Sequence, residues 1–412
     1  MDVKLTKNKM RAERYLIFAL LFLLGACSPK GKENADFPEK ELEKSEKQLS
    51  LLLDDANKEG KNPRTVTADG HMHWATRDNG SFDWTLGFFP GSCWYMYEFT
   101  KEEKWKEGAI KLQNQLEKFK SFKHSHDLGF VFQCSFGNAY RLTHNKAYID
   151  VLEEAGNSLI TRFNPNVGCI QSWNVDRGWQ SKRGWEFPVI IDNMMNLEML
   201  FELSKNTGDD KYRKVAIAHA NTTMKNHFRE DFSSFHVIDY NPETGEVRNK
   251  HTAQGYAHES AWARGQAWGL YGYTVCYRYT KDEKYLQQAK EIANYIINYK
   301  GTPKDMIPYW DYNAPNIPKE PRDVSAAAIT ASALLELSEY TEGKYYEDAE
   351  KILHSLASEV YTAKYGENNH FLLKHSVGSI PHNNEIDVPL NYADYYYIEA
   401  LMKYKNLKSQ QS

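Results

Sequence analysis

A short polar signature recurs five times along this chain and constrains its fold more than any other feature. Each copy is a threonine followed within five residues by a lysine and an aromatic ring, and the threonines are Thr100, Thr143, Thr207, Thr280 and Thr341. An apolar segment precedes each copy and an amphipathic segment follows it, so the copies mark helix starts. A unit of helix, tight turn and helix, repeated at roughly sixty residues, is typical of stacked helical units that bury their apolar faces against neighbours.

Five such turns and a final helix over about residues 391–407 predict six helical hairpins. Six hairpins can close into a ring, so we expect an all-α protein, an (α/α)6 barrel, with residues 37–412 as one domain. An open solenoid is the alternative, but tetratricopeptide and ankyrin repeats have periods near 33 or 34 residues. The longer period leaves room for functional loops such as residues 168–188 and 233–264, with a short strand near residues 235–240.

The first residues have the pattern of a targeting sequence rather than of part of the folded domain. Residues 1–14 are basic, residues 15–24 are apolar, and Leu24-Gly25-Ala26-Cys27 has the pattern of a lipobox, so residues 1–26 are expected to be a lipoprotein signal peptide. The apolar run is shorter than the roughly 20 residues that a helix needs to span a bilayer. The polar residues 27–36 would then form a tether that begins at the lipidated Cys27.

This start predicts a cell-envelope protein whose lipid anchor is its only membrane contact. We expect it to face the periplasm, because Ser28-Pro29-Lys30 lacks the acidic run that often follows the cysteine of a surface-exported lipoprotein. An ordinary signal peptide cut near Cys27 is the alternative. The formal net charge of −4 provides no basic field for nucleic acid.

The motif inventory points away from a cofactor, a metal and a nucleophilic serine. The sequence contains no Walker loop and no G-x-G-x-x-G, G-x-S-x-G or H-E-x-x-H motif. His71 and His73 could share one side of a strand, but nothing near them completes a metal shell. The cysteines beyond Cys27 are far apart and form no C-x-x-C pair, so buried thiols are expected. They are Cys93, Cys134, Cys169 and Cys276.

Two aspartates interrupt apolar runs where inner helices are expected to begin. Asp127 precedes Leu-Gly-Phe-Val-Phe, and Asp192 follows Val-Ile-Ile. A buried carboxylate at such a place is either a helix cap or a working acid or base. Two carboxylates flanking one bond are the usual machinery of glycoside cleavage. The 10 Trp, 27 Tyr and 19 Phe residues would suit a cleft that stacks sugar rings, although a large core is the simpler explanation.

A third constellation combines Gln254 with residues 261–269, in which small and large side chains alternate. This pattern indicates an extended entry into a helix that projects Trp262, Arg264 and Gln266 together. Arginine matches a carboxylate with a bidentate fork, and tryptophan offers a flat face to a sugar. We therefore favour a binding role over core packing.

At these residues the sequence resembles the unsaturated glucuronyl hydrolases, glycoside hydrolase family 88. The similarity covers nearly the whole chain after the leader. It runs through Trp84, Gly91, Trp94, Asp127, Gly129, Asp192, Asn193, Asn196, Trp262, Arg264, Gln266, Trp268, Glu385, Asp387, Pro389, Tyr392 and Asp394.

The resemblance implies an (α/α)6 barrel and an unusual reaction. Polysaccharide lyases leave a C4=C5 double bond on a terminal uronate, and enzymes of this family hydrate that enol ether in glycosaminoglycan fragments. The position of Asp192 protonates C4 and assists the water that attacks C5, whereas that of Asp127 stays ionised and hydrogen-bonds the sugar. An ordinary aspartate carries almost no proton at neutral pH, so burial and the charge of Asp127 must raise the pKa of Asp192.

The resemblance also implies a set of substrate-binding residues. The loop at residues 374–379 departs from the Ser and Lys pattern of members that favour sulfated substrates. The expected binding residues are His236, Gln254, Arg264 and Trp268, the walls Trp179, Trp185 and Trp262, and Thr252 and Ser379.

Two other functions remain open from the sequence. The unsaturated rhamnogalacturonyl hydrolases share the fold and the hydration chemistry but act on pectin fragments. A non-catalytic glycan-binding lipoprotein would also use a helical scaffold with aromatic platforms, but it would not need two buried aspartates. The Asp127 motif and the Trp262-x-Arg264 pair favour the glucuronyl hydrolases.

Overall fold

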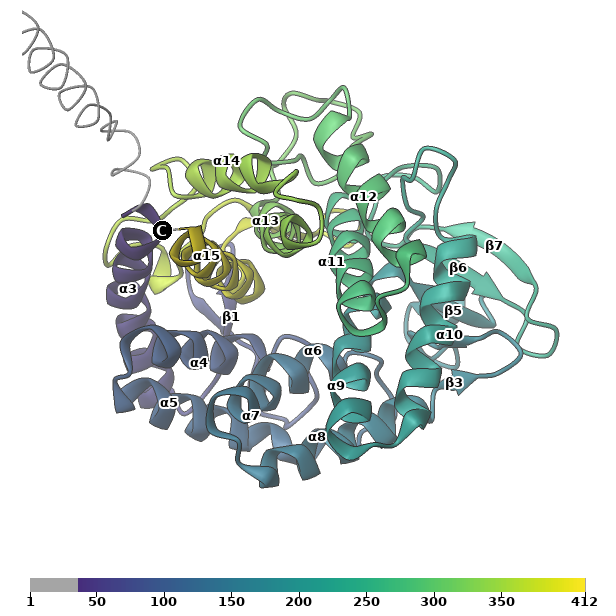
Figure 1. The fold of residues 1–412 in the computed structure, drawn as a ribbon, viewed down its shortest axis with the longest axis horizontal. Helices are drawn as coiled ribbons and strands as arrows, with labels where there is room; N and C mark the ends of the chain where they lie inside the picture. The colour runs from purple at the N-terminus through teal and green to yellow at the C-terminus, as the bar shows by residue number, and fades with distance from the viewer. Residues whose placement is uncertain (1–35, 412) are drawn as a thin grey trace, which may run out of the picture. The chain divides into compact units, whose positions relative to one another are not determined.

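The computed structural model describes residues 36–411, of which those from Glu41 onward form a compact unit. An inner ring of helices surrounds its centre (Figure 1). The ring consists of α4 (Phe88–Thr100), the broken helix of α6 (Leu128–Phe132), a π turn (Gln133–Gly137) and α7 (Asn138–Thr143), then α9 (Leu197–Thr207), α11 (Ala263–Thr280), α13 (Val324–Glu339) and α15 (Asn391–Gln411).

An outer helix accompanies each member of the ring, and the chain alternates between the two layers (Figure 1). The outer helices are α3 (Phe37–Glu59), α5 (Glu103–Gln113), α8 (Lys146–Ile160), α10 (Asp210–Asn226), α12 (Glu283–Asn298) and α14 (Tyr346–Leu356). Within the described residues this is six inner and six outer helices, so the predicted (α/α)6 barrel is confirmed.

The recurring threonine signature forms a turn between an inner and an outer helix in all five places. Each threonine hydroxyl donates to the carbonyl four residues earlier, as Thr100 does to Met96 at 2.8 Å. The next residue has a left-handed backbone, with φ between 52° and 75°, and in the first four turns it is the C-cap of the inner helix. These residues are Lys101, His144, Gly208, Lys281 and Glu342. An asparagine or aspartate then caps the outer helix in three of the turns, at Asn145, Asp209 and Asp282.

Short antiparallel strands decorate the barrel without changing its class. The largest sheet joins β5 (Phe187–Ile190), β6 (Val237–Tyr240) and β7 (Val247–His251). The strand expected near residues 235–240 is therefore present, but the apolar run before Asp192 is a strand rather than part of a helix start. It is extended because Ile190 and Phe187 pair with Val237 and Tyr240 of β6. The smaller sheets pair β1 (Pro63–Val66) with β2 (Met72–Trp74), β3 (Phe163–Asn164) with β4 (Cys169–Ile170), and β8 (Ser376–Ser379) with β9 (Asn384–Val388).

Glycines on α11 bring it close to the segment that carries Asp192. A Cβ atom on Gly272 would lie 2.5 Å from Cβ of Met194, and one on Gly265 would lie 3.0 Å from Cγ2 of Ile191. Only a residue without a side chain permits this approach. The short 3-10 helix Ile191–Asn196 is thereby held against the inner wall of the barrel.

Other expectations concern the cysteines and the membrane. The four cysteines of the barrel are buried free thiols, as expected. Among residues 36–411, no helix is long and apolar enough to cross a membrane. The signal peptide and Cys27 lie outside the described residues, so their assignment stays a prediction.

Candidate active site

The residues singled out by sequence gather where inner helices begin. Asp127 immediately precedes α6, and Asp192 lies in the 3-10 turn that leads into α9. Trp262 precedes α11 with an extended backbone, and Asp323 caps α13. Helix N-termini carry partial positive charge, so this end of the barrel suits an anionic ligand.

Asp127 occupies an N-cap position, but its side chain does not cap the helix. Its carboxylate instead accepts a hydrogen bond of 2.8 Å from the hydroxyl of Ser125. The other oxygen lies 3.1 Å from Nε2 of His126. The capping alternative is therefore wrong for this side chain, which faces polar groups beside the second aspartate.

Asp192 is a buried carboxylate with an unusual protonation equilibrium. Burial raises its pKa to about 7, and the negative charge of Asp127 adds to that rise, whereas Arg264 opposes it. The expectation of a raised pKa from burial and like charge is thus confirmed. Its Oδ2 atom is buried and accepts no hydrogen bond from any residue that the structure describes.

Two other buried aspartates show that a raised pKa alone does not identify an acid. The pKa of Asp311 is raised to about 6 and that of Asp394 to about 7, both by burial. Both oxygens of Asp394 accept backbone amides, from Leu372 and Leu373. Asp311 likewise uses both oxygens, because Oδ2 accepts from Tyr256 and Ser260 and Oδ1 accepts the amide of Asn313. These two carboxylates are occupied structurally, whereas Asp192 keeps an oxygen available.

Several buried donors surround Asp192 and also lack a protein partner. Nε2 of His236 lies 3.6 Å from its Oδ2 atom, and the indole of Trp268 is close enough to lower its pKa. Nε1 of Trp268, Nε2 of His236 and Nε of Arg264 make no hydrogen bond within residues 36–411. Buried polar groups are normally satisfied, so this convergence indicates a site prepared for a polar ligand.

Arg264 lies over the ring of Trp262, with its guanidinium carbon 4.5 Å from the ring centroid. Its terminal nitrogens contact the carbonyl of Val377, the carbonyl of Gly378 at 2.7 Å and the carboxylate of Asp323 at 3.1 Å. The side chain therefore fixes strand β8 as well as facing the aspartates. Its role toward a substrate carboxylate stays a prediction.

Strand β8 and the loop before α11 bring further predicted residues to the same place. Gln254 donates from Nε2 to the carbonyl of Gly378 at 3.3 Å. Ser379 contacts Nδ1 of His382 at 2.7 Å, and Thr252 accepts the amide of Gly255 at 2.8 Å.

Aromatic rings form a wall beside His236. Trp185 stacks on Trp173 with ring centroids 5.7 Å apart, and Trp179 meets Trp173 edge-on at 5.0 Å. Trp173 also packs 5.9 Å from His236, whose other side faces Trp262 at 4.7 Å. Sequence reasoning assigned Trp179, Trp185 and Trp262 but missed Trp173, which lies at the centre of the cluster.

Gln266 does not join this site, contrary to the expectation from its motif. Its side chain accepts the amide of Ser234 at 2.8 Å and donates to the carbonyl of Phe232 at 2.7 Å. Residues two apart on a helix point to different faces, so Arg264 and Gln266 diverge once α11 begins at Ala263. Gln266 holds a turn instead.

A buried hydrogen-bond network, also missed from the sequence, connects the two aspartate segments. The hydroxyl of Ser172 accepts from the amide of Ile190 and from Asn193 Nδ2, at 2.9 and 3.0 Å. Asn193 in turn binds Asn196, which accepts the amide of Gly129 at 2.8 Å. Asn193 and Asn196 stand beside Asp192 in the sequence, and that proximity was the available signal.

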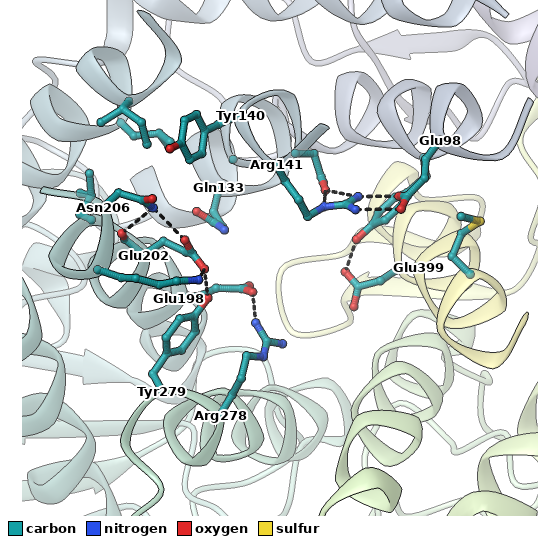
Figure 2. A pocket seen from close by; sticks show the side chains of 18 of the residues that line it. Glu98, Gln133, Tyr140, Arg141, Glu198, Glu202, Asn206, Arg278, Tyr279 and Glu399 are labelled. Atoms are coloured by element: carbon teal, nitrogen blue, oxygen red, sulfur yellow. Dashed lines mark hydrogen bonds and ion pairs between the residues drawn. The ribbon is translucent and has the colours of Figure 1, made fainter. Parts of the chain in front are cut away.

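A second cavity, of about 570 Å³, lies nearer the opposite ends of the inner helices. Figure 2 shows its charged side chains paired with one another, as Arg141 is with Glu98 at 2.6 Å. Arg278 similarly joins Glu198 and Glu336. These charges are already neutralised, whereas the donors around Asp192 have unmet capacity, so we place the active site at the aspartate pair.

Comparison with known proteins agrees with this fold. The sequence profile of glycosyl hydrolase family 88 matches residues 58–407. An unsaturated glucuronyl hydrolase of Formosa agariphila is 44% identical over 402 residues, which cover 95% of this chain and 97% of that protein. An unsaturated chondroitin disaccharide hydrolase of Streptococcus agalactiae is 32% identical over 89% and 91% of the two chains.

A solved structure gives the same result. The crystal structure of an unsaturated glucuronyl hydrolase specific for heparin has a TM-score of 0.84 and 47% sequence identity, and the match covers 91% of this chain and 98% of that one. The resemblance indicated by the sequence motifs is confirmed, and the chain belongs to glycoside hydrolase family 88.

Proposed function

We propose that this protein is an unsaturated glucuronyl hydrolase, which removes the terminal 4,5-unsaturated uronic acid from lyase-generated glycosaminoglycan oligosaccharides. The observation that carries the proposal is Asp192, a buried carboxyl whose pKa is raised to about 7 and whose Oδ2 atom is unoccupied by the described residues. Such a group can hold a proton at neutral pH and deliver it to a ligand. Family membership and the names of the similar enzymes give the reaction in which that proton is used.

The chemistry follows from an enol ether that must be protonated at carbon. Asp192 transfers its proton to C4, which develops positive charge at C5 and its ring oxygen. The resulting Asp192 carboxylate then accepts a proton from the water that attacks C5. The product is a hemiketal, which opens spontaneously and releases the rest of the saccharide, so no covalent glycosyl intermediate is required.

Asp127 has a different role in this proposal, because it does not supply the proton. It stays ionised, accepts hydrogen bonds from sugar hydroxyls and raises the pKa of Asp192 through its charge. Its contacts with Ser125 and His126 set the direction of its oxygens.

The substrate carboxylate is assigned to the donors that the protein leaves unsatisfied. Arg264 Nε and Trp268 Nε1 are buried donors without partners in the described part of the chain. The terminal nitrogens of Arg264 already donate hydrogen bonds to β8 and Asp323. Nε is therefore the guanidinium nitrogen that has no hydrogen-bond partner among the described residues. The rings of Trp262, Trp173 and Trp185 would flank the sugar.

The proposal is tested with a panel of lyase-generated disaccharides. Loss of the near-ultraviolet absorbance of the conjugated double bond reports hydration directly. The panel contains heparin, chondroitin and hyaluronan disaccharides, with an unsaturated pectin disaccharide as the comparison. Hydration of the pectin fragment alone would assign the protein to the rhamnogalacturonyl hydrolases, and binding without any loss of absorbance would indicate a glycan-binding protein.

The location of the enzyme is a separate part of the proposal. A lipid on Cys27 would hold the barrel at the cell envelope, facing the periplasm, where oligosaccharides from outside the cell arrive. The lipobox-like sequence before Cys27 and the polar residues after it support this assignment.

A further inference from the structure

Arg264 carries a buried positive charge close to Asp192. The residue is 1% exposed and lies in the first turn of α11, where a charge without a partner would be costly. Burial lowers the pKa of its guanidinium, but Tyr392, Asp323, Asp192 and Glu385 raise it, and the pKa ends above its ordinary value. Among the residues that the structure describes, Asp323 is the carboxylate that forms an ion pair with Arg264.

Asp323 uses its two oxygens for different purposes. Oδ1 caps α13, because it accepts the amide of Ser325 at 3.1 Å and the hydroxyl of the same residue at 2.6 Å. Oδ2 takes no part in the cap and accepts from Nη1 of Arg264 at 3.1 Å. Asp323 is fully buried, so its charge is little screened by water. Capping therefore explains one oxygen of Asp323, and Arg264 explains the other.

The terminal nitrogens of Arg264 are held by three acceptors. Nη1 donates to Asp323 and to the carbonyl of Val377, and Nη2 donates to the carbonyl of Gly378 at 2.7 Å. A guanidinium is planar and rigid, so fixing both terminal nitrogens also fixes the direction of Nε. Nε is buried and has no hydrogen-bond partner within residues 36–411. Two of the three acceptors are neutral carbonyls, so Asp323 is the acceptor that also supplies charge.

We propose that Asp323 is a positioning residue, which balances the buried charge of Arg264 and holds its guanidinium with Nε free for the substrate carboxylate. This inference rests on the proposed function, in which Arg264 binds that carboxylate. Asp323 does not touch the sugar in this arrangement and acts only through Arg264. Its loss should therefore affect the enzyme in ways that differ from the loss of an ordinary buried ion pair.

The same two helices provide a matched ion pair for comparison. Arg278 of α11 pairs with Glu336 of α13 at the second cavity, whereas Arg264 of α11 pairs with Asp323 of α13 at the aspartate site. Both acids are buried, at 0% and 5% exposure for Asp323 and Glu336. Glu336→Gln thus breaks a buried charge pair between α11 and α13 without changing the proposed active site.

Asp323→Asn isolates the charge, because asparagine is as good a helix N-cap as aspartate. Its remaining oxygen can keep the cap, while its NH2 group faces Nη1 of Arg264 and cannot accept from it. With an unsaturated disaccharide as substrate, KM should rise by about tenfold, as expected for the loss of a charge-assisted hydrogen bond. The rise in KM should exceed the fall in kcat, because the carboxylate is bound in both the ground state and the transition state.

Glu336→Gln should lower the melting temperature as Asp323→Asn does, but it should leave KM unchanged. An unchanged or lower KM in Asp323→Asn would overturn the inference, because it would make Asp323 either irrelevant to Arg264 or a competitor of the substrate carboxylate. An equal rise in KM in both variants would also overturn it, since a general loss of packing between α11 and α13 would then explain the effect.

The pH profile is a readout that a purely structural role would not move. Burial raises the pKa of Asp192, Arg264 lowers it, and Asp127 raises it further. His236, which faces Asp192 at 3.6 Å, adds no charge because burial lowers its own pKa. Without Asp323 the charge of Arg264 is no longer balanced, so the alkaline limb of kcat should move to lower pH. A limb that stays in place would count against the inference.

A double-variant cycle tests whether Asp323 acts through Arg264. In an Arg264→Lys background, where the forked guanidinium is absent, Asp323→Asn should raise KM much less than it does in the wild-type protein. Equal effects of Asp323→Asn in the two backgrounds would mean that Asp323 acts by another route, and the inference would be wrong.

The orientation of Arg264 is tested on the unaltered protein without substrate, so the result does not depend on the folding of Asp323→Asn. Nitrogen-15 NMR of arginine-labelled protein reports rotation of the guanidinium, and loss of a signal in Arg264→Lys assigns it. The two terminal nitrogens of Arg264 should give separate signals, because their acceptors prevent rotation. A single averaged signal would show that the guanidinium is not held, and would overturn the inference.

The two proposals can fail separately. If Asp192→Asn still hydrated the disaccharide, the proposed mechanism would be wrong, but NMR of the unliganded protein would still decide whether Arg264 is held. If Asp192→Asn were inactive while Asp323→Asn and Glu336→Gln gave the same KM and the same pH profile, only the inference about Asp323 would fall.

Discussion

Nε2 of His236 lies 3.6 Å from Oδ2 of Asp192, and the opposite ring nitrogen accepts hydrogen bonds from two backbone amides. The amides of Ala253 and Gln254, at 3.0 and 3.1 Å, require a lone pair on Nδ1. The neutral ring therefore carries its hydrogen on Nε2 and faces Asp192 as a donor. Burial holds the pKa of His236 well below its usual range, so it stays neutral and is not the acid of this site.

The rate should fall as pH rises through the pKa of Asp192. The acid form is required to protonate C4, and that form is lost above about pH 7, where its pKa is raised chiefly by burial. The rate should drop about tenfold per pH unit on that side. Asp192→Asn should abolish turnover while disaccharide binding remains measurable by calorimetry.

The control for this prediction is Glu259, an exposed carboxyl in the loop before α11. Its side chain is 81% exposed and lies 3.7 Å from Arg229, so Glu259→Gln should keep the normal profile. Near-normal activity of a correctly folded Asp192→Asn variant would show that the assigned mechanism is wrong.

Asp192 should also lower the stability of the protein at alkaline pH. Its pKa is about 7 when folded and about 4 when unfolded, so between these values the folded state binds more protons. The free energy of unfolding then falls as pH rises from about 4 to about 7, and the whole of this loss is present at higher pH. Asp192→Asn should raise the free energy of unfolding by about 2–4 kcal/mol at pH 8 and by little near pH 4, as measured in urea.

Asp394 is a matched comparison, because its pKa is also raised to about 7 by burial. Both of its oxygens accept backbone amides, so an asparagine would turn an NH2 group toward one of them. Asp394→Asn should therefore destabilise the protein at pH 8. If both variants were stabilised equally, the unoccupied oxygen of Asp192 would not explain its effect on stability.

The sequence predicted the barrel well because the determinants of its turns are local. In each of the five signatures the threonine hydroxyl, the left-handed residue and the start of the next helix lie within a few residues. The strand before Asp192 was not predicted, since an apolar run such as Phe187–Ile190 suits a strand or a helix entry equally. Its pairing with β6, about fifty residues later, decides between them.

In the candidate site too, features set by the local sequence could be predicted, whereas features set by contacts between distant segments could not. Asp127 and Asp192 could be found because carboxylates in apolar runs are unusual. The contact of His126 with the carbonyl of Ser172, 46 residues away, could not be predicted, because no local pattern indicates it. Gln266 was assigned to the site because alternating residue sizes suggested an extended segment, but the helix begins at Ala263 and turns it away.

Arg264→Lys should lower kcat/KM although the charge is kept. A lysine has a single ammonium group, which cannot replace Nε toward the substrate while also serving β8 and Asp323. A loss of about 1.5–3 kcal/mol is expected for one charge-assisted hydrogen bond. Arg278→Lys is the control, because Arg278 lies on the same helix but pairs with Glu198 and Glu336 at the second cavity. Unchanged kcat/KM in Arg264→Lys would remove that residue from the site.

Cys27→Ser should release the protein from the membrane fraction. The prediction follows from the lipobox-like sequence alone, because a serine cannot receive the thioether-linked lipid. Fractionation followed by immunoblotting measures the outcome, and Cys93→Ser controls for loss of a cysteine, since that thiol is buried in the barrel. A Cys27→Ser protein that stayed with the membrane would contradict the anchor.

Asp127→Asn should affect the reaction in two separable ways. The first is a large loss of kcat/KM, because the amide places a donor where the sugar hydroxyls need an acceptor. The second concerns Asp192, whose pKa is raised partly by the charge of Asp127, so removing that charge should lower it. The alkaline limb of the residual kcat profile should then move to lower pH. Ser125→Ala, which removes the two hydrogen bonds between its hydroxyl and Asp127 but keeps the charge, should leave the position of the limb unchanged. If the limb stayed in place in Asp127→Asn, burial alone would set the acid, and the two carboxylates would not be electrostatically coupled.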